Sequence, residues 1–223
     1  MIDINLLLEK VKEYYLADSA KLGEAVLQML FENLKFLDDE REVCVRVYFL
    51  DRFYSTQLTL HSAHLNMIQS IYKNRNKVKG LKTQSLFEGG DVESISALYH
   101  IILEDGRGAD KSRSQQWSFV SKFLHFCYPN QYPIFDNTVN NYIEKAIERY
   151  PQISPQNSVR WSTPVYSDFC KEYIKVWDEF SESQKVRLCE GLEGVASEVG
   201  LDEITPLTAL DKYFWYHLVR LIT

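Results

Sequence analysis

The sequence predicts an all-α protein, a helical bundle of two lobes. Apolar residues recur at intervals of three and four along most of the 223 residues, and neither a βαβ pattern nor an internal repeat is present. Hydrophobic residues make up 45% of the chain, enough to bury a core without metal ions or disulfide bonds. We expect a single domain, with a core lobe of about residues 91–149 and a second lobe formed by the N-terminal helices and the last helix.

Two helices are expected at the N-terminal end. The apolar face of the first, at helical spacing, comprises Ile4, Leu7, Leu8, Val11 and Tyr15. Asp18 and Ser19 are residue types that cap helix N-termini, so a second helix is expected to begin after them. Its apolar face comprises Leu22, Val26, Leu30, Leu34 and Leu37.

Residues 42–49 fit two structures. Val43, Val45 and Val47 alternate with other residues as they would in a strand, whereas Val43, Val47, Leu50 and Tyr54 recur as they would in a helix. We predict the helix.

The middle of the chain is expected to alternate between helix and connection. A helix is predicted over residues 61–72, followed by a polar connection over 73–88 that is broken by Gly80. Gly89, Gly90 and Asp91 then introduce another helix, which Gly106 closes. Its apolar face comprises Val92, Ile95, Leu98, Tyr99 and Ile102.

Three further segments complete the expected elements. A helix carrying Trp117, Val120, Phe123, Leu124 and Cys127 stops before Pro129, and an extended turn over 129–134 leads to Asp136. Val139, Ile143 and Ile147 mark the next helix, and residues 150–163, with their prolines and serines, are the expected linker. Ser181 with Gln184 has the form of a capping box, and Thr205 before Pro206 begins the last helix, with Leu210, Phe214, His217 and Leu218.

The charge distribution contains a basic island, residues 52–87. The formal net charge of the chain is −6, but residues 1–51, 52–87 and 88–223 carry −5, +6 and −7. Such a block can neutralise phosphate groups of DNA, or it can be a solvated connection that pairs with the acidic parts of the chain, and the sequence leaves both open. Its clustered bases are Lys73, Arg75, Lys77, Lys79 and Lys82.

Several features argue against other classes of protein. The apolar runs are too short to span a bilayer, and Asp3, Glu9 and Glu13 occupy the place of a signal peptide's positive charges, so we expect a cytoplasmic protein. The four cysteines lie far apart and are expected to be reduced, buried thiols. His61 and His64 have the spacing of a metal site but no third ligand, so neither a metal nor another cofactor is expected.

The segment from Gly106 to Ile143 has a polar, basic approach beginning GRGADKSR, an apolar helix, a turn bounded by prolines, and the sequence YPIFDNTV. In this order of features it resembles the helix-hairpin-helix DNA glycosylase superfamily. In that superfamily a catalytic aspartate follows such a turn, and here Trp117 and Asp136 are 19 residues apart. The hairpin is reduced to Gly106, Arg107 and Gly108, which departs from the usual family pattern.

The resemblance implies a monofunctional enzyme. In members of the superfamily that also cut the DNA backbone, a lysine forms a Schiff base, but at that position this chain has Gln116 or Trp117. A tryptophan at this position resembles the alkylated-adenine glycosylases, which are monofunctional. The implied partner is double-stranded DNA with a damaged or modified base, of the cell or of a phage, and we expect a monomer. The expected base pocket comprises Trp117, Tyr54, Ser55 and Gln57. The expected DNA contacts comprise Arg107, Lys111, Arg113, Lys73, Arg75, Lys77, Lys79 and Lys82.

The chemistry of glycosidic cleavage suits Asp136. A fixed carboxylate stabilises the oxocarbenium-like sugar and orients the attacking water. Asp136 could instead be only an N-cap of the following helix, and Lys122 is expected at the surface. Two other functions stay open: a noncatalytic nucleic-acid-binding protein, and a helical interaction or regulatory module.

Overall fold

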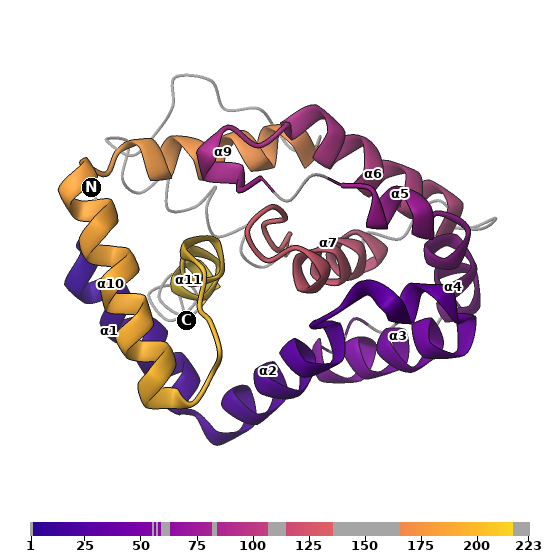
Figure 1. Ribbon diagram of the computed structural model, residues 1–223, viewed down its shortest axis with the longest axis horizontal. Coiled ribbons are helices and arrows are strands. Elements are labelled where there is room, and N and C mark those ends of the chain that lie inside the picture. The colour runs from indigo at the N-terminus through magenta and orange to yellow at the C-terminus, as the bar shows by residue number, and fades with distance from the viewer. Residues whose placement is uncertain are drawn as a thin grey trace.

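The computed structural model describes residues 2–54, 56, 58, 63–81, 84–106, 115–135 and 166–215. Within these ranges the regular structure is helical throughout, which confirms the all-α prediction. Figure 1 shows outer helices arranged around two inner ones, α7 and α11. In chain order the helices are α1 (Ile4–Leu16), α2 (Asp18–Phe31), the 3-10 helix η1 (Leu34–Asp38), α3 (Glu40–Tyr54), α4 (His64–Lys73), α5 (Arg75–Lys79), the 3-10 helix η3 (Leu86–Glu88), α6 (Val92–Gly106), α7 (Gln115–Cys127), α9 (Tyr166–Asp178), α10 (Glu182–Val199) and α11 (Pro206–Tyr213).

Local capping explains where several helices begin. Asp3 accepts hydrogen bonds from the first amides of α1, and Thr205 caps α11 ahead of Pro206. The predicted capping box is present, because Ser181 accepts from the amide of Gln184 and the Gln184 side chain accepts from the amide of Ser181. The expected start of the second helix is wrong: α2 begins at Asp18 itself, with Ala17 at the N-cap position and no side-chain cap.

The second helix also ends earlier than its apolar pattern indicates. It stops at Phe31, and Leu34 and Leu37 belong to η1. Leu22, expected on the apolar face, is 69% exposed, whereas Leu27 is fully buried. The error arises because a leucine-rich helix offers more than one apolar stripe, and only its neighbours decide which stripe is covered.

Two segments in the middle of the chain resolve open questions. The ambiguous residues 42–49 lie within α3, as predicted, with Val43, Val47 and Leu50 buried. Residues 73–88 are not a plain connection, because they contain α5 and η3. Val78 and Leu86 are buried and attach these short helices to the core. The sequence did not predict this, because most residues around them are polar.

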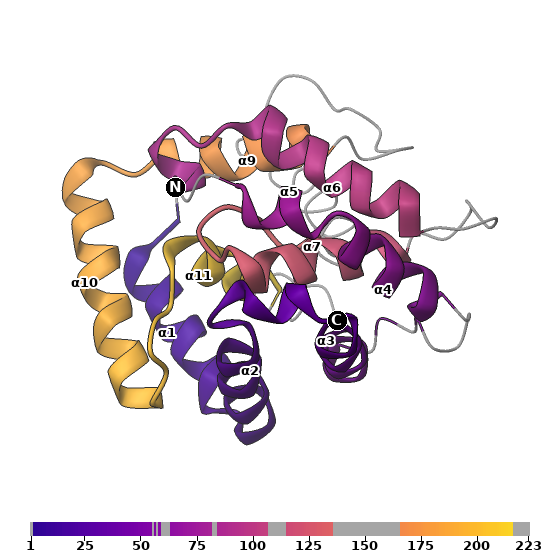
Figure 2. The ribbon, with the colours of Figure 1, turned by 45° about the vertical axis from the view of Figure 1, so that its right-hand side comes forward.

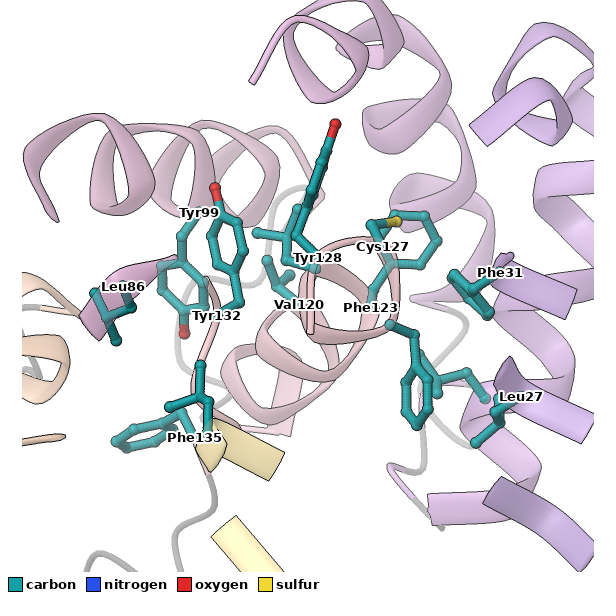
Figure 3. Close-up of a cluster of buried hydrophobic side chains, with 14 of the residues drawn as sticks. Leu27, Phe31, Leu86, Tyr99, Val120, Phe123, Cys127, Tyr128, Tyr132 and Phe135 are labelled. Carbon is teal, nitrogen blue, oxygen red and sulfur yellow. The ribbon is translucent and has the colours of Figure 1, made fainter. Parts of the chain in front are cut away.

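The core connects the two ends of the chain. Figure 3 shows Leu27 and Phe31 on one side of α7, and Tyr99, Tyr132 and Phe135 on another. Helix α1 packs against α10 and α11, which Figure 2 shows together at one side of the molecule, and α6 packs against α4, α7 and α9. Residues 166–215 therefore complete the environment of helices that lie far before them in the chain.

The division into two lobes stays a prediction, because residues 136–165 lie outside the described ranges. The expected helix after Asp136 and the expected linker fall on the same residues, and His217 and Leu218 also lie outside. In the described part of the chain no helix is both long and apolar enough to cross a membrane. Cys127 and Cys170 are buried as expected, but Cys189 is exposed, which corrects that expectation.

Candidate functional site

The segment between α7 and residue 136 is held in place by side chains from three helices; residues 129–131 form a turn, so the expected extended turn over 129–134 is not extended throughout. We call residues 128–135 the strap. The Ile134 amide donates to Asp211 Oδ2 of α11 at 3.1 Å, and the Tyr166 hydroxyl of α9 donates to the Pro133 carbonyl at 2.6 Å. The Tyr132 carbonyl accepts from His125 Nδ1 of α7 at 2.7 Å. Because side chains of the helices satisfy these buried backbone groups, the strap has a fixed path although it contains no helix or strand.

The last residue of the strap is held on both sides by one serine. The Phe135 amide donates to Ser121 Oγ at 2.9 Å, and the same hydroxyl lies 3.2 Å from the Phe135 carbonyl. That carbonyl belongs to the peptide group that joins Phe135 to residue 136. The chain is therefore fixed up to the bond that precedes Asp136.

The opposite end of the strap is tied to the basic island. The Tyr128 hydroxyl donates to the Val78 carbonyl at 2.6 Å, and the Leu86 amide donates to the Asn130 carbonyl at 2.8 Å. Gln131 Nε2 donates to the Gln84 carbonyl at 2.9 Å. The turn that follows α7 and the connection between α5 and α6 therefore form one hydrogen-bonded unit.

One face of α7 carries polar side chains, two of which, Ser121 and His125, contact the strap. Ser118, Ser121, Lys122 and His125 recur at intervals of three and four, and the Lys122 ammonium donates to Ser118 Oγ. Lys122 is only 4% exposed, so its expected place at the surface is wrong. Its ammonium lies 5.1 Å from the centre of the Tyr54 ring, close enough for a cation–π interaction, and this contact helps to make its burial tolerable.

A buried ion pair lies beside the same tyrosine. Lys212 Nζ of α11 donates to Glu24 Oε1 of α2, and the Tyr54 hydroxyl donates to the same oxygen at 2.6 Å. Burial by itself would raise the pKa of Glu24, but the charge and hydrogen bonds of Lys212, with that of Tyr54, outweigh it and lower the pKa. Burial likewise opposes the ammonium form of Lys212, and the Glu24 carboxylate outweighs it and raises the pKa. Both groups are therefore charged at neutral pH.

Asp211 and His125 form a second buried polar group. Burial raises the pKa of Asp211 to about 7, against the hydrogen bonds from Tyr173 and Ile134. Burial lowers the pKa of His125 to about 4, so its ring is neutral at pH 7 and the 3.8 Å contact between His125 Nδ1 and Asp211 Oδ2 is not an ion pair. The neutral ring carries its proton on Nδ1, which donates to the Tyr132 carbonyl, while Nε2 accepts from Thr208 Oγ1 at 3.2 Å.

The predicted site residues divide into those described and those not. Trp117 is partly buried, with its ring centre 6.3 Å from that of Phe135, so it lies beside the end of the strap. Tyr54 lies in the buried cluster, where its hydroxyl is engaged by Glu24. The predicted residues outside the described ranges are Asp136, Ser55, Gln57, Arg107, Lys111, Arg113, Lys82 and His61.

The basic island makes several internal contacts. Lys73 pairs with Asp105 at 3.0 Å and Lys79 with Asp38 at 2.5 Å, while the Arg75 guanidinium lies 4.4 Å from the centre of the Tyr72 ring. Lys77 is exposed. These contacts favour the view that the island pairs with acidic parts of the chain. Surface pairs contribute only about 0–1 kcal/mol, so these lysines could still exchange their partners for phosphate.

The sequence did not reveal Glu24, Asp211 and Lys212 as buried. The sequence of the last helix could have indicated their burial, because Asp211 and Lys212 interrupt an otherwise apolar run. Charged side chains in such a run are buried only when they are paired. In the described part of the chain, no group of three or more His, Cys, Asp or Glu side chains is placed to hold a metal ion.

Comparison with known proteins identifies part of the chain. A protein-family model, HI_0787_N, described as an N-terminal domain, matches residues 4–131, more than half of the sequence. No curated protein and no solved structure is significantly similar to the chain. The matched segment includes Glu24, Tyr54 and the whole of α7, whereas Asp211 and Lys212 lie beyond it.

Proposed function

The chain belongs to the HI_0787_N family, whose description names a domain and no activity, so we propose its function from the site: a monofunctional DNA glycosylase in which Asp136 is the catalytic carboxylate. The observation that carries this proposal is the strap. Hydrogen bonds from α7, α9 and α11 hold the backbone as far as the Phe135 carbonyl. A catalytic side chain must be held in a defined position, and a fixed backbone before it favours this.

The proposed reaction is hydrolysis of the bond between a damaged or modified base and its deoxyribose. As the base departs, positive charge develops on the sugar, and the Asp136 carboxylate stabilises that charge and orients the attacking water. The water oxygen bonds to the sugar carbon, and the departing base takes up a proton. The product is an intact strand with an abasic site, and cytoplasmic DNA of the cell or of a phage would supply the substrate.

Neighbouring side chains support this chemistry. Trp117, beside Phe135, offers an aromatic surface on which an extruded base could stack. The buried Lys122 donates to Ser118 and lies over Tyr54, so it is engaged as a donor and is not presented as a free amine. Cleavage therefore proceeds without a Schiff base in this proposal, and borohydride should trap no covalent complex with DNA.

The experiment is a panel of duplexes that contain alkylated, oxidised, deaminated and phage-type modified bases. Each duplex is incubated with protein and then with alkali, which cleaves abasic sites. Asp136→Asn should slow base release by a factor on the order of a hundred to a thousand, because the negative charge is needed only in the transition state. Asparagine caps a helix about as well as aspartate, so the variant should stay folded.

The matched control is Asp168→Asn on α9, which also removes one carboxylate but lies on the outer part of a helix. It should release base at the parental rate. An Asp136→Asn protein that excises base as fast as the parent would show that Asp136 is only a helix cap, and the glycosylase mechanism would be wrong.

A further inference from the structure

The turn from α4 into α5, residues 73–77, holds the carboxylate of Asp105 from the last turn of α6. We call these five residues the corner, and Figure 1 shows the three helices together at one side of the molecule. Lys73 Nζ lies 3.0 Å from each oxygen of that carboxylate, and Asn74 Nδ2 donates to its Oδ2 at 2.9 Å. The hydrogen bonds from Asn74 and Lys73 lower the pKa of Asp105, and the charges of Lys73 and Lys77 lower it further. The corner therefore binds a full negative charge at neutral pH.

Asn74 is the fixed part of the corner. It is only 4% exposed, and its Nδ2 also donates to the Ser70 carbonyl at 3.0 Å. The Ser70 hydroxyl in turn donates to the Ile102 carbonyl of α6 at 2.7 Å, so both helices set the position of the Asn74 amide. One of the two hydrogens on Nδ2 goes to Ser70 and the other to Asp105. Without Asp105 the second hydrogen would need another acceptor, because an unsatisfied buried donor is costly.

The helix that carries Asp105 does not favour a carboxylate at this position. The C-terminal end of a helix carries a partial negative charge, and the last turn of α6 contains no basic residue. Asp105 is therefore held in place by the corner and not by its own helix. The side chains of Lys73 and Asp105 are 69% and 33% exposed, so an external anion can reach the lysine directly. It can reach Asn74 once the Asp105 side chain turns away.

We propose that the corner is a phosphate-binding site for the backbone of double-stranded DNA, and that Asp105 occupies it as an intramolecular substitute for a phosphate group. A carboxylate and a phosphodiester both present two oxygens that share one negative charge, so donors that hold the first also suit the second. Asp105 is thus an autoinhibitory contact that lowers the affinity for any duplex. The choice of DNA as the ligand rests on the proposed glycosylase function.

The surroundings of the corner suit a polyanion. Residues 52–87 contain no acidic side chain, so the bases of the island are neutralised only by acids from other segments, such as Asp105 of α6 and Asp38 of η1. Asp105 directly precedes Gly106, where the expected hairpin begins, and the corner therefore borders the segment that is expected at DNA. A duplex presents a row of phosphates, which basic side chains spaced along a surface can neutralise together.

The first measurement is the affinity of the full chain for an unmodified duplex, which requires no base release. Asp105→Asn removes the charge but keeps an acceptor oxygen for Asn74, so the corner should stay folded. At about 0.1 M salt the affinity should rise on the order of tenfold, because Lys73 becomes available for a charge-assisted hydrogen bond to phosphate. The slope of log affinity against log salt should become steeper by about 0.9, as expected for one additional phosphate contact.

Lys73→Gln separates occupation of the site from a general effect of charge. In the parent, Asp105 holds Lys73, so Lys73→Gln should change the affinity by about twofold or less. In the Asp105→Asn background the same substitution should weaken binding about tenfold, because there Lys73 binds phosphate.

The matched control is Asp38→Asn, which removes an equal charge from beside the same island and leaves the pair of Lys73 and Asp105 intact. In that background Lys73→Gln should again have the small effect. A general effect of charge predicts that Lys73→Gln weakens binding by the same factor in all three backgrounds.

The side chain of Asn74 reports directly on occupation of the corner. Asp105→Ala vacates the place of the carboxylate, so the NH₂ resonances of Asn74 should shift when the duplex is added. In the parent, where Asp105 stays in place, they should be unchanged by the same duplex. Melts followed by circular dichroism check that the variants are folded, and the affinities of Asp105→Asn decide the question if Asp105→Ala is not.

Two results would overturn the proposal: equal effects of Lys73→Gln in the parent and in Asp105→Asn, or Asn74 resonances in folded Asp105→Ala that do not respond to the duplex. The same coupling with single-stranded RNA but not with duplex DNA would overturn the choice of DNA.

The outcomes for the site and for the proposed enzyme are distinguishable. A chain that shows the coupling but releases no base from any duplex of the panel fails only as a glycosylase. A chain that releases base without the coupling has no phosphate site at the corner. If neither the parent nor any variant binds a duplex, the phosphate site and the glycosylase function are both wrong.

Discussion

Buried ionisable side chains gather where α2, α7 and α11 meet, and burial affects them in two ways. Glu24 and Lys212 offset the loss of hydration with each other's charge, so both stay ionised. Among the described residues, Asp211 and His125 have no oppositely charged partner within hydrogen-bond distance, and burial shifts the pKa of each in the direction that favours its neutral form. The same region therefore contains a charged pair and a pH-sensitive pair.

Removing one member of the charged pair should be much worse than removing both. Glu24→Gln leaves the Lys212 ammonium buried without a counter-ion, and we expect a loss of about 3–5 kcal/mol in the free energy of unfolding. Glu24→Met combined with Lys212→Met should recover most of this loss, because it leaves no unpaired charge. Urea denaturation of the three proteins at pH 7 measures both effects. A double variant as unstable as the single one would contradict this account.

The pH-sensitive pair should make opposite contributions to stability. The pKa of Asp211 is raised in the folded protein, so its contribution is fully present below about pH 4 and is lost as the pH rises to about 7. The pKa of His125 is lowered to about 4, so its contribution is present above about pH 6.5 and is lost as the pH falls toward 4.

The two variants should therefore change the pH dependence in opposite directions. Between pH 4.5 and pH 6.5, the free energy of unfolding of Asp211→Asn should rise with pH more steeply than that of the parent, since the opposing effect of Asp211 is gone. His125→Gln should rise less steeply than the parent or fall. Denaturant titrations at several pH values provide the measurement, and curves parallel to that of the parent would contradict the pKa shifts.

At the scale of the elements, glycines mark where helices approach closely. A Cβ atom placed on Gly23 of α2 would lie 1.5 Å from the Phe53 ring of α3, so any other residue at this position would displace that ring. A Cβ atom on Gly194 of α10 would meet nothing within 4 Å. Both glycines lie inside helices, where glycine lowers helix stability relative to alanine by about the same amount at either position.

This contrast yields a matched pair of substitutions. Gly194→Ala should stabilise the protein by about 0.5–1 kcal/mol, because it lowers the entropy of the unfolded chain and adds no contact. Gly23→Ala should destabilise it by about 1–3 kcal/mol, because Phe53 has to leave its place. Thermal melts followed by circular dichroism compare the two. Equal shifts of Tm would mean that α2 and α3 are not packed as described.

At the scale of the whole molecule, the family segment is not a self-contained unit. Helix α1 lies against α10 and α11, and α6 lies against α9, so residues 166–215 cover faces of the matched segment 4–131. The strap extends past residue 131 and is held by Tyr166 and Asp211. Cutting the chain at the end of the match would leave apolar faces open and Glu24 without Lys212.

A fragment of residues 1–131 should therefore fail to fold cooperatively. It should show reduced helicity, a broad thermal transition and poor dispersion of NMR signals, since small domains fold only when enough apolar surface is buried. Supplying residues 132–223 as a separate chain should restore a cooperative transition. Cooperative unfolding of the fragment by itself, with the stability of the full chain, would show that the C-terminal helices are dispensable for the fold.

The sequence by itself determined the features that depend on near neighbours in the chain. The apolar periodicity of α1, α3, α6 and α7 predicted these helices, and the predicted capping box of Ser181 and Gln184 is present at the start of α10. Each depends on contacts within a few residues, so short patterns are enough to specify it. Asp136 was selected by the same kind of pattern, and its catalytic role stays a prediction.

Only the tertiary structure decided which polar residues are buried and which apolar ones are exposed. Lys212 meets Glu24 across 188 positions of the chain, and Asp211 meets the Ile134 amide across 77. Nothing local distinguishes Lys122, which is buried, from a surface lysine, or Leu22, which is exposed, from a core leucine. The physical reason is that burial is a property of the neighbours that cover a side chain, and here those neighbours come from helices far away in the sequence.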